Sequence, residues 1–272
     1  MSFSEDVRKR RSVRTFTGEP LCSEHLEALE KHFSEADNPY GIRVEFRILD
    51  AEKFGLQSPV LAGAAQYIGA KVRRGPHSDE AFGYSFEDLV MFCTELGIGT
   101  TIIAGTMNRS AFEEAMELEN GEYMPCITPV GYAAERMSLK ETVMRKGVRA
   151  DSRFGWEKLF FDGTFERTLT TEDVRIRDML ELVRWAPSAV NRQPWRVVKG
   201  GDKFHFYCQH SRGMSAGEAG DMQKIDLGIA MYHFARAAEE QKLEAGFSIA
   251  DPEIHHSPDM EYIATYTISE KE

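Results

Sequence analysis

A short basic segment near the N-terminus has the residue types of a phosphate site. The chain reads Arg-Arg-Ser-Val-Arg-Thr-Phe from residue 10 to residue 16. A guanidinium group offers a charged fork of donors that matches a phosphate, and hydroxyl and backbone N–H groups can complete the contacts. The net charge of the protein is −11, so a basic cluster needs a local anion. The segment predicts a site for a phosphate monoester, whereas without Ser12 and Arg14 the solvated end of a terminal helix would be the simpler interpretation.

A second polar segment could bind the edge of a planar heterocycle. Residues 186 to 195 read Ala-Pro-Ser-Ala-Val-Asn-Arg-Gln-Pro-Trp. We interpret them as a turn in which Ser188, Asn191 and Gln193 carry hydroxyl and amide groups, before Pro194 and Trp195 open an apolar run. Such groups donate and accept hydrogen bonds in the way that the polar edge of a heterocycle requires.

The composition narrows the class of protein. The chain has 272 residues, of which 42% are hydrophobic and 28% charged, enough for a core in one large or two small domains. The negative net charge disfavours nucleic acids and anionic membranes as partners. A polar N-terminus and the lack of a long apolar run favour a cytoplasmic protein without a membrane span. Buried, reduced thiols are expected because no metal or disulfide spacing links the four cysteines, Cys22, Cys93, Cys126 and Cys208.

Hydrophobic periodicity predicts the elements that position the two polar segments. Apolar residues at helical spacing predict helices over 23–33, 82–96, 108–118, 171–186 and 226–242. Alternation predicts strands over 43–49, 65–72, 124–132, 196–199, 203–207 and 262–269, with a hairpin turn at 200–202 and a short strand or loop at 100–104. We expect Ser23 and Asn108 to be N-caps, Thr171 or Asp173 to start its helix, and Gly97 to follow a helix end.

The order of elements repeats along the chain. The helix, turn and strand that lead to Val44 correspond to those that lead to Val197, and the helix end at Gly97 corresponds to one expected over 243–246. We interpret the repeat as an internal duplication with halves at 1–145 and 146–272, although helix and strand orders also recur by chance in α+β chains.

Other motifs do not carry chemistry. Residues 97–102 fall short of a dinucleotide fingerprint, because Ile102 replaces the last glycine and a helix precedes them. His255 and His256 lie between prolines and indicate a surface loop rather than a metal site. The remaining aromatic cluster is assigned to the core or an interface: Trp156, Phe160, Phe161 and Phe165.

Taken together, the polar segments resemble the nitroreductase family of FMN-dependent oxidoreductases. The family's R-R-S-x-R motif matches at 10–14, and its P-S-x-x-N-x-Q-P-W motif matches at 187–195. Its L-G-x-G-T…G-G motif matches at 96–105, with Ala104 in place of one glycine. Its V-G-Y-P strand end matches at 130–133 with Ala133 in place of proline, and Ser152 and Arg153 resemble its later S-R motif.

The resemblance implies roles for the matched residues. The arginine segment would hold the phosphate and ribityl chain of FMN, with Arg14 at the N1/O2 edge of the ring. Backbone N–H groups of the glycine motif would meet N5 and O4, and the turn would contact the ring. Arg153 is the best candidate for a basic residue that returns to the phosphate, ahead of Arg149, Lys146 and Arg145. The expected cofactor-binding residues are Arg10, Arg11, Ser12, Arg14, Thr101, Ile103, Ala104, Gly105, Arg149, Arg153, Pro187, Ser188, Asn191 and Gln193.

The placement of the motifs implies an architecture. In the family, each flavin site takes the ring-contacting turn from the partner subunit and the other motifs from its own. Here the turn position of the first half, 35–40, is degenerate, and the second half lacks the arginine and glycine motifs. The chain is similar to the branch known as putative TM nitroreductases. We therefore expect an α+β, nitroreductase-like pseudo-dimer with antiparallel or mixed sheets flanked by helices, one FMN site, and a monomeric or weakly dimeric state.

The reaction implied by the resemblance is ping-pong reduction. NADH or NADPH would deliver hydride to the flavin N5 and leave, and a small electron-poor acceptor such as a nitroaromatic or a quinone would then be reduced. No catalytic side chain and no metal are expected, because the flavin carries the redox chemistry. Three alternatives stay open: another flavin reaction such as dehalogenation, desaturation or flavin breakdown, a non-catalytic flavin-binding or sensor protein, and a site too degenerate to bind flavin.

Overall fold

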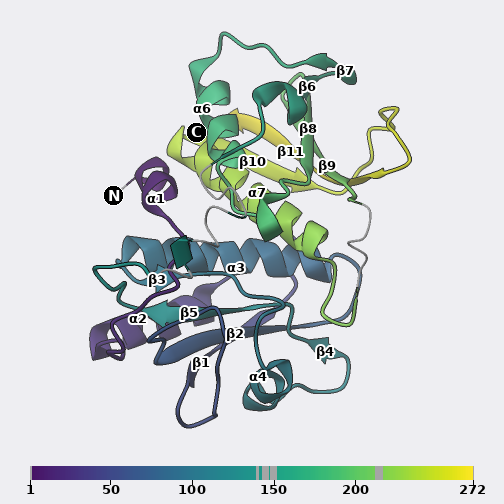
Figure 1. Ribbon diagram of the computed structural model, residues 1–272. Coiled ribbons are helices and arrows are strands. Elements are labelled where there is room, and N and C mark those ends of the chain that lie inside the picture. Colours follow the sequence, from purple (N-terminus) through teal and green to yellow (C-terminus); the bar gives the residue numbers. More distant parts are fainter. Residues whose placement is uncertain (1, 139–140, 143–146, 148–151, 212–216, 272) are drawn as a thin grey trace.

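Two sheets with helices between and around them form the molecule (Figure 1). The computed structural model describes residues 2–138, 141–142, 147, 152–211 and 217–271. The first sheet is antiparallel, in the order β1-β2-β5-β3 with β4 also paired to β2, and comprises β1 (Val44–Asp50), β2 (Gln66–Arg73), β3 (Gly99–Thr100), β4 (Glu122–Tyr123) and β5 (Ile127–Gly131).

The second sheet is mixed, because β6 runs parallel to β8 while its other pairings are antiparallel. Its order is β10-β11-β9-β8-β6-β7. The strands are β6 (Phe160–Asp162), β7 (Thr164–Thr168), β8 (Trp195–Gly200), β9 (Lys203–Gln209), β10 (Leu243–Ser248) and β11 (Met260–Glu270).

Two long helices pack against each other between the sheets (Figure 1). They are α3 (Ser78–Glu95) and α7 (Met222–Glu240), and most of their residues are buried. At the crossing a Cβ on Gly83 would lie 2.0 Å from the Ile225 carbonyl oxygen, and one on Gly228 would lie 2.1 Å from that of Glu80. Glycine at both positions is therefore what lets the two backbones touch.

Shorter helices complete the described part of the chain. They are α1 (Phe3–Lys9), α2 (Ser23–Glu35), α4 (Arg109–Ala115), α6 (Val174–Arg184) and the 3₁₀ turns η1 (Trp156–Lys158) and η2 (Ala189–Asn191). The largest apolar cluster joins α3 and α7 to the inner faces of both sheets, with Phe86, Trp195 and Phe234 at most 2% exposed. Burying a side chain of this size contributes about 1.5–3 kcal/mol to folding.

The predicted elements are confirmed in kind except for the helix end at 243–246, and several of their ends need correction. The predicted helix end at 243–246 is wrong, because α7 stops at Glu240, Lys242 takes a φ of +60°, and the segment pairs with β11. Ser23 is the first residue of α2 rather than its N-cap. Asn108 precedes α4, but its side chain bonds Gln57 and Gly55 instead of capping the helix. The N-cap of α6 is Asp173, and Gly97 follows α3 with a φ of +77°.

Helix α1 and the β6–β7 hairpin were not predicted as regular structure, and neither were β4 and η1. Helix α1 is short, with a capping box from Ser2 to Glu5. The β6–β7 hairpin contains Phe160, Phe161 and Phe165 of the aromatic cluster assigned to the core or an interface, and Trp156 begins η1. No helix of the described chain has the length and apolar character needed to cross a membrane.

Candidate functional site

A cavity of about 320 Å³ brings together most of the residues that the sequence singled out. Small-molecule sites in proteins commonly have volumes of about 300–1,000 Å³. The predicted residues on its wall are Arg10, Ser12, Arg14, Thr101, Ile103, Ala104, Gly105, Arg153, Pro187, Ser188 and Asn191. Arg11 and Gln193 are not on the wall, and Arg149, Lys146 and Arg145 lie outside the described residues.

The arginine segment lies in an extended conformation along the first sheet. Ser12 forms a parallel bridge with Thr100, and Val13 donates to the Thr100 carbonyl at 2.8 Å. The next residues pair with a loop on the other side, where Ala62 donates to the Arg14 carbonyl at 3.0 Å. Alternate residues of an extended chain point to opposite sides, so Arg10, Ser12 and Arg14 reach the cavity.

The same alternation explains why Arg11 is not on the cavity wall. Arg11 is exposed, and Val13 is buried against the protein. The sequence alone does not distinguish Arg11 from Arg10 and Arg14, because the residue type does not show which side of the backbone each arginine side chain takes.

The loop after β3 forms the part of the wall predicted from the glycine motif. The backbone N–H of Thr101 donates to the Thr128 hydroxyl at 3.0 Å, and that of Ile103 donates to the Ile127 carbonyl at 2.9 Å. These two N–H groups are therefore engaged within the first sheet. The structure shows no bond from the N–H groups of Ala104 and Gly105 to any described residue. Among the predicted residues of this motif, Ala104 and Gly105 are therefore the ones whose N–H groups could donate to a ligand.

The turn on the opposite wall contains unusual backbone conformations. Val190, Asn191 and Gln193 have φ values of +45°, +58° and +50°. A β-branched residue such as Val190 rarely adopts a positive φ, and the strain must be held by surrounding contacts. Strained backbone of this kind concentrates at functional sites.

Gln193 supplies several of the contacts that hold the turn. Its side chain is 1% exposed, accepts from the Phe154 N–H at 2.8 Å and donates to the Asn191 carbonyl at 3.1 Å. Its backbone N–H donates to the Ser188 hydroxyl at 2.9 Å. Gln193 therefore lies beneath the turn and braces it, while Ser188 and Asn191 reach the cavity.

Arg153 reaches the cavity because the turn fixes the chain around it. Its guanidinium donates to the Trp185 carbonyl at 3.1 Å and lies over the Trp185 ring, 5.0 Å from the centroid. The Asn191 side chain donates to the Ser152 carbonyl at 3.0 Å. The turn thus binds the residues on both sides of Arg153.

Asp226 is a cavity residue that the sequence analysis missed. It lies on α7, is 1% exposed, and accepts the Ala189 N–H on its two oxygens at 2.9 and 3.1 Å. Burial raises the pKa of this carboxyl well above its ordinary value, and the nearby Asp221 and Glu87 raise it further against the effect of the Ala189 bond. A single acid within the apolar run from Ile225 to Ala230 is the signal that could have revealed it.

The described wall combines cations with apolar surface. It carries three guanidinium groups, from Arg10, Arg14 and Arg153, and one carboxyl group, from Asp226. Five residues of the wall have hydroxyls: Ser12, Thr100, Thr101, Thr106 and Ser188. Its apolar part includes Val60, Val90, Ile102, Met222, Ile225 and Ile229. Such a donor set fits a ligand with a phosphate and a planar, largely apolar body.

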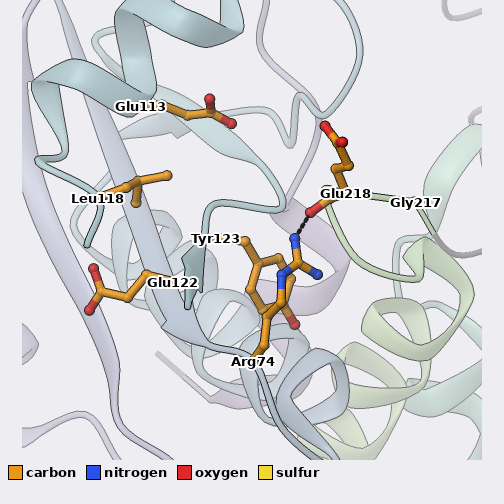
Figure 2. A pocket seen from close by; sticks show the side chains of 7 residues that line it. All are labelled: Arg74, Glu113, Leu118, Glu122, Tyr123, Gly217 and Glu218. Atoms are coloured by element: carbon orange, nitrogen blue, oxygen red, sulfur yellow. Dashed lines mark hydrogen bonds between the residues drawn. The ribbon is translucent and has the colours of Figure 1, made fainter. Parts of the chain in front are cut away.

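A larger and more open hollow, of about 600 Å³, lies beside β4 (Figure 2). Its only described cation is Arg74, which lies over the Tyr123 ring at 4.3 Å and bonds the Glu218 carbonyl. Tyr123 donates to Asp79 at 2.6 Å, and Asp79 accepts the Asp221 N–H at 3.0 Å. These groups bond one another and connect β4 and α3 to the N-cap of α7 at Asp221, so their role is structural.

The fold is nitroreductase-like: it has two sheets, a central pair of helices and a cavity lined by arginines. Residues 2–238 match the family model described as "Putative TM nitroreductase", and the chain belongs to this family. The chain is similar to a protein from Thermotoga maritima described as a putative nitroreductase. The two are 19% identical, the match covers 98% of this chain and 94% of that one, and the TM-score is 0.63.

Two further similar structures match about half of this chain. An FMN-dependent nitroreductase from Clostridium difficile is 21% identical, with 49% of this chain and 88% of that one covered and a TM-score of 0.43. An iodotyrosine deiodinase bound to FMN and 3-iodo-L-tyrosine is 18% identical. That match covers 50% of this chain and 92% of the deiodinase chain, with a TM-score of 0.42. No curated protein matches the sequence.

Proposed function

We propose that the protein binds one FMN in this cavity and acts as an NAD(P)H-dependent reductase of small electron-poor acceptors, of the nitroaromatic or quinone type. The observation that carries the proposal is the convergence of two distant segments on one cavity. Arg10, Ser12 and Arg14 line one wall, and Ser188 and Asn191 line another. Family membership supports the same conclusion.

Different residues of the cavity would bind different parts of the cofactor. Arg10 and Arg153 would neutralise the phosphate, and Ser12 would add a hydroxyl donor. Arg14 would lie at the ring edge, where negative charge develops on reduction, and Ala104 or Gly105 would supply a backbone donor. FMN itself supplies the hydride-accepting centre. The protein then contributes position, charge and the exclusion of water, without a dedicated acid or base.

We also propose that the chain consists of two related halves, 1–145 and 146–272, with a single flavin site. The counterpart of the ring-contacting turn in the first half contains Tyr40. The Tyr40 ring lies 5.3 Å from that of His77, at the start of α3, and 4.8 Å from that of Phe247 on β10. In the proposed duplication, these aromatic side chains would occupy the place that corresponds to the cavity.

The visible spectrum of the purified protein tests the proposal directly. After incubation with FMN and removal of free cofactor, we expect one FMN per chain and rapid loss of the flavin absorption on addition of NADH or NADPH. A protein that retains no FMN would refute the proposal. A protein that retains FMN but is reduced by neither nucleotide would be a flavin-binding protein, and a screen of acceptors with the reduced protein would distinguish other flavin reactions.

A further inference from the structure

The buried carboxyl of Asp226 has an unusual set of neighbours. Both of its oxygens face one backbone N–H, that of Ala189, in a turn 37 residues away in sequence. Among the described residues it has no other hydrogen-bond partner and no basic nitrogen in ion-pair range. The Ala189 N–H is thus tied to α7 immediately before the left-handed residues Val190 and Asn191.

The protonation state of Asp226 affects both the stability of the core and the electrostatics of the cavity, because other charged groups lie nearby. Asp221 and Glu87 are acidic neighbours, and Glu87 bonds His233 at 2.9 Å in the core. Three arginines line the same cavity. An ionised Asp226 would be an uncompensated buried charge, which is costly. It would also attract the arginines and repel an anionic ligand, whereas a neutral carboxylic acid does neither.

We infer that Asp226 is a positioning residue that holds the ligand-binding turn through the Ala189 N–H, and that it does so as a neutral carboxylic acid. The effect on flavin rests on the proposed function, but the effect on the turn does not. The backbone bond needs only an uncharged acceptor, so an amide at position 226 should replace the acid.

The test compares three variants that separate hydrogen bonding from charge. Asp226→Asn keeps an uncharged acceptor of the same shape. Asp226→Leu fills a similar volume among apolar neighbours without an acceptor, and Asp226→Ala is a second non-accepting variant should leucine fail to pack. Asp178→Asn, on the exposed face of α6, makes the same charge change away from the cavity and serves as the control.

Amide hydrogen exchange of the cofactor-free protein tests the turn itself. In Asp226→Leu and Asp226→Ala we expect residues 188–193 to exchange about tenfold faster, which corresponds to about 1.4 kcal/mol. Asp226→Asn and the control should exchange at the parent rate. Unchanged exchange in the non-accepting variants would overturn the positioning role. Equally fast exchange in Asp226→Asn would show that the negative charge is required and would overturn the neutral form.

FMN titration tests the consequence for the ligand. The dissociation constant of Asp226→Asn should match that of the parent at neutral pH, with the same flavin midpoint potential, and the non-accepting variants should bind about tenfold more weakly. At alkaline pH the parent should lose affinity relative to Asp226→Asn as Asp226 ionises. A more positive midpoint potential in Asp226→Asn would mean that the parent carboxyl is charged. A parent that binds no FMN would refute the proposed function, and hydrogen exchange would still decide the role of Asp226.

Discussion

Replacement of Arg14 by alanine is the sharpest test of the proposed site. The Arg14 side chain is partly buried and reaches the cavity, whereas its backbone carbonyl is held separately by Ala62. Truncation should therefore leave the segment in place. A hydrogen bond to a charged group contributes about 1.5–3 kcal/mol, so Arg14→Ala should raise the dissociation constant of FMN about 10- to 150-fold. The dissociation constant is measured from the quenching of flavin fluorescence as the protein is titrated into FMN.

Arg11→Ala provides a matched control, because Arg11 is exposed and points away from the cavity. It removes the same charge from the same segment and should change the dissociation constant less than about twofold, as expected of an exposed charge. Arg14→Lys should give an intermediate loss, since it keeps the charge but not the planar fork. Unchanged affinity in Arg14→Ala, or an equal loss in Arg11→Ala, would refute the assignment of this segment.

Three further predictions concern the framework of the site. Gly63→Ala should lower the melting temperature and weaken FMN binding, because a Cβ there would lie 2.4 Å from the Phe16 carbonyl oxygen at a φ of +73°; normal affinity would contradict this. Gly228→Ala should lower the free energy of unfolding by about 1–3 kcal/mol in a denaturant titration, because overpacking separates α3 from α7, while Gly105→Ala, with open space around the Cβ, should cost little. Burial raises the pKa of Asp226 above 3.8, so the folded chain keeps a proton that the unfolded chain loses above that pH. The free energy of unfolding should therefore fall as pH rises from 3.8 toward the raised pKa, and Asp226→Asn should gain stability relative to the parent over that interval; a constant difference would contradict the raised pKa.

Local patterns in the sequence were sufficient to predict most of the framework. Helical spacing predicted α2 and α6, because each has an apolar face toward the core and a polar face toward solvent. Alternation predicted the strands β1 and β9, although residues 204–208 of β9 are buried on both faces. Leu, Glu and Ala at 243–245 favour helix and predict a helix end, but the pairing with β11 makes this segment the strand β10. Tertiary pairing of this kind is not encoded in a local pattern.

For the candidate site too, the sequence predicts some features, and contacts between distant segments decide the others. Residue types identified arginines, hydroxyls and amides that could bind a flavin, and most of them line the cavity. Which of them face the ligand depends on backbone geometry set by distant segments. Gln193 was expected at the ligand, but its amide bonds Phe154 and Asn191 beneath the turn. Asp226 was overlooked because its partner, Ala189, is far away in sequence.

The cavity depends on both proposed halves, and the helix crossing shows why they cannot act separately. The arginine segment and the loop after β3 come from the first half, and the turn and Asp226 come from the second. The first half supplies Arg10 and Arg14 without the turn, and the second supplies the turn and Arg153 without the arginine segment. Because α3 and α7 are in contact at Gly83 and Gly228, separating the halves would expose the buried faces of both helices. Binding of the ligand and formation of the core therefore require the same contact between α3 and α7.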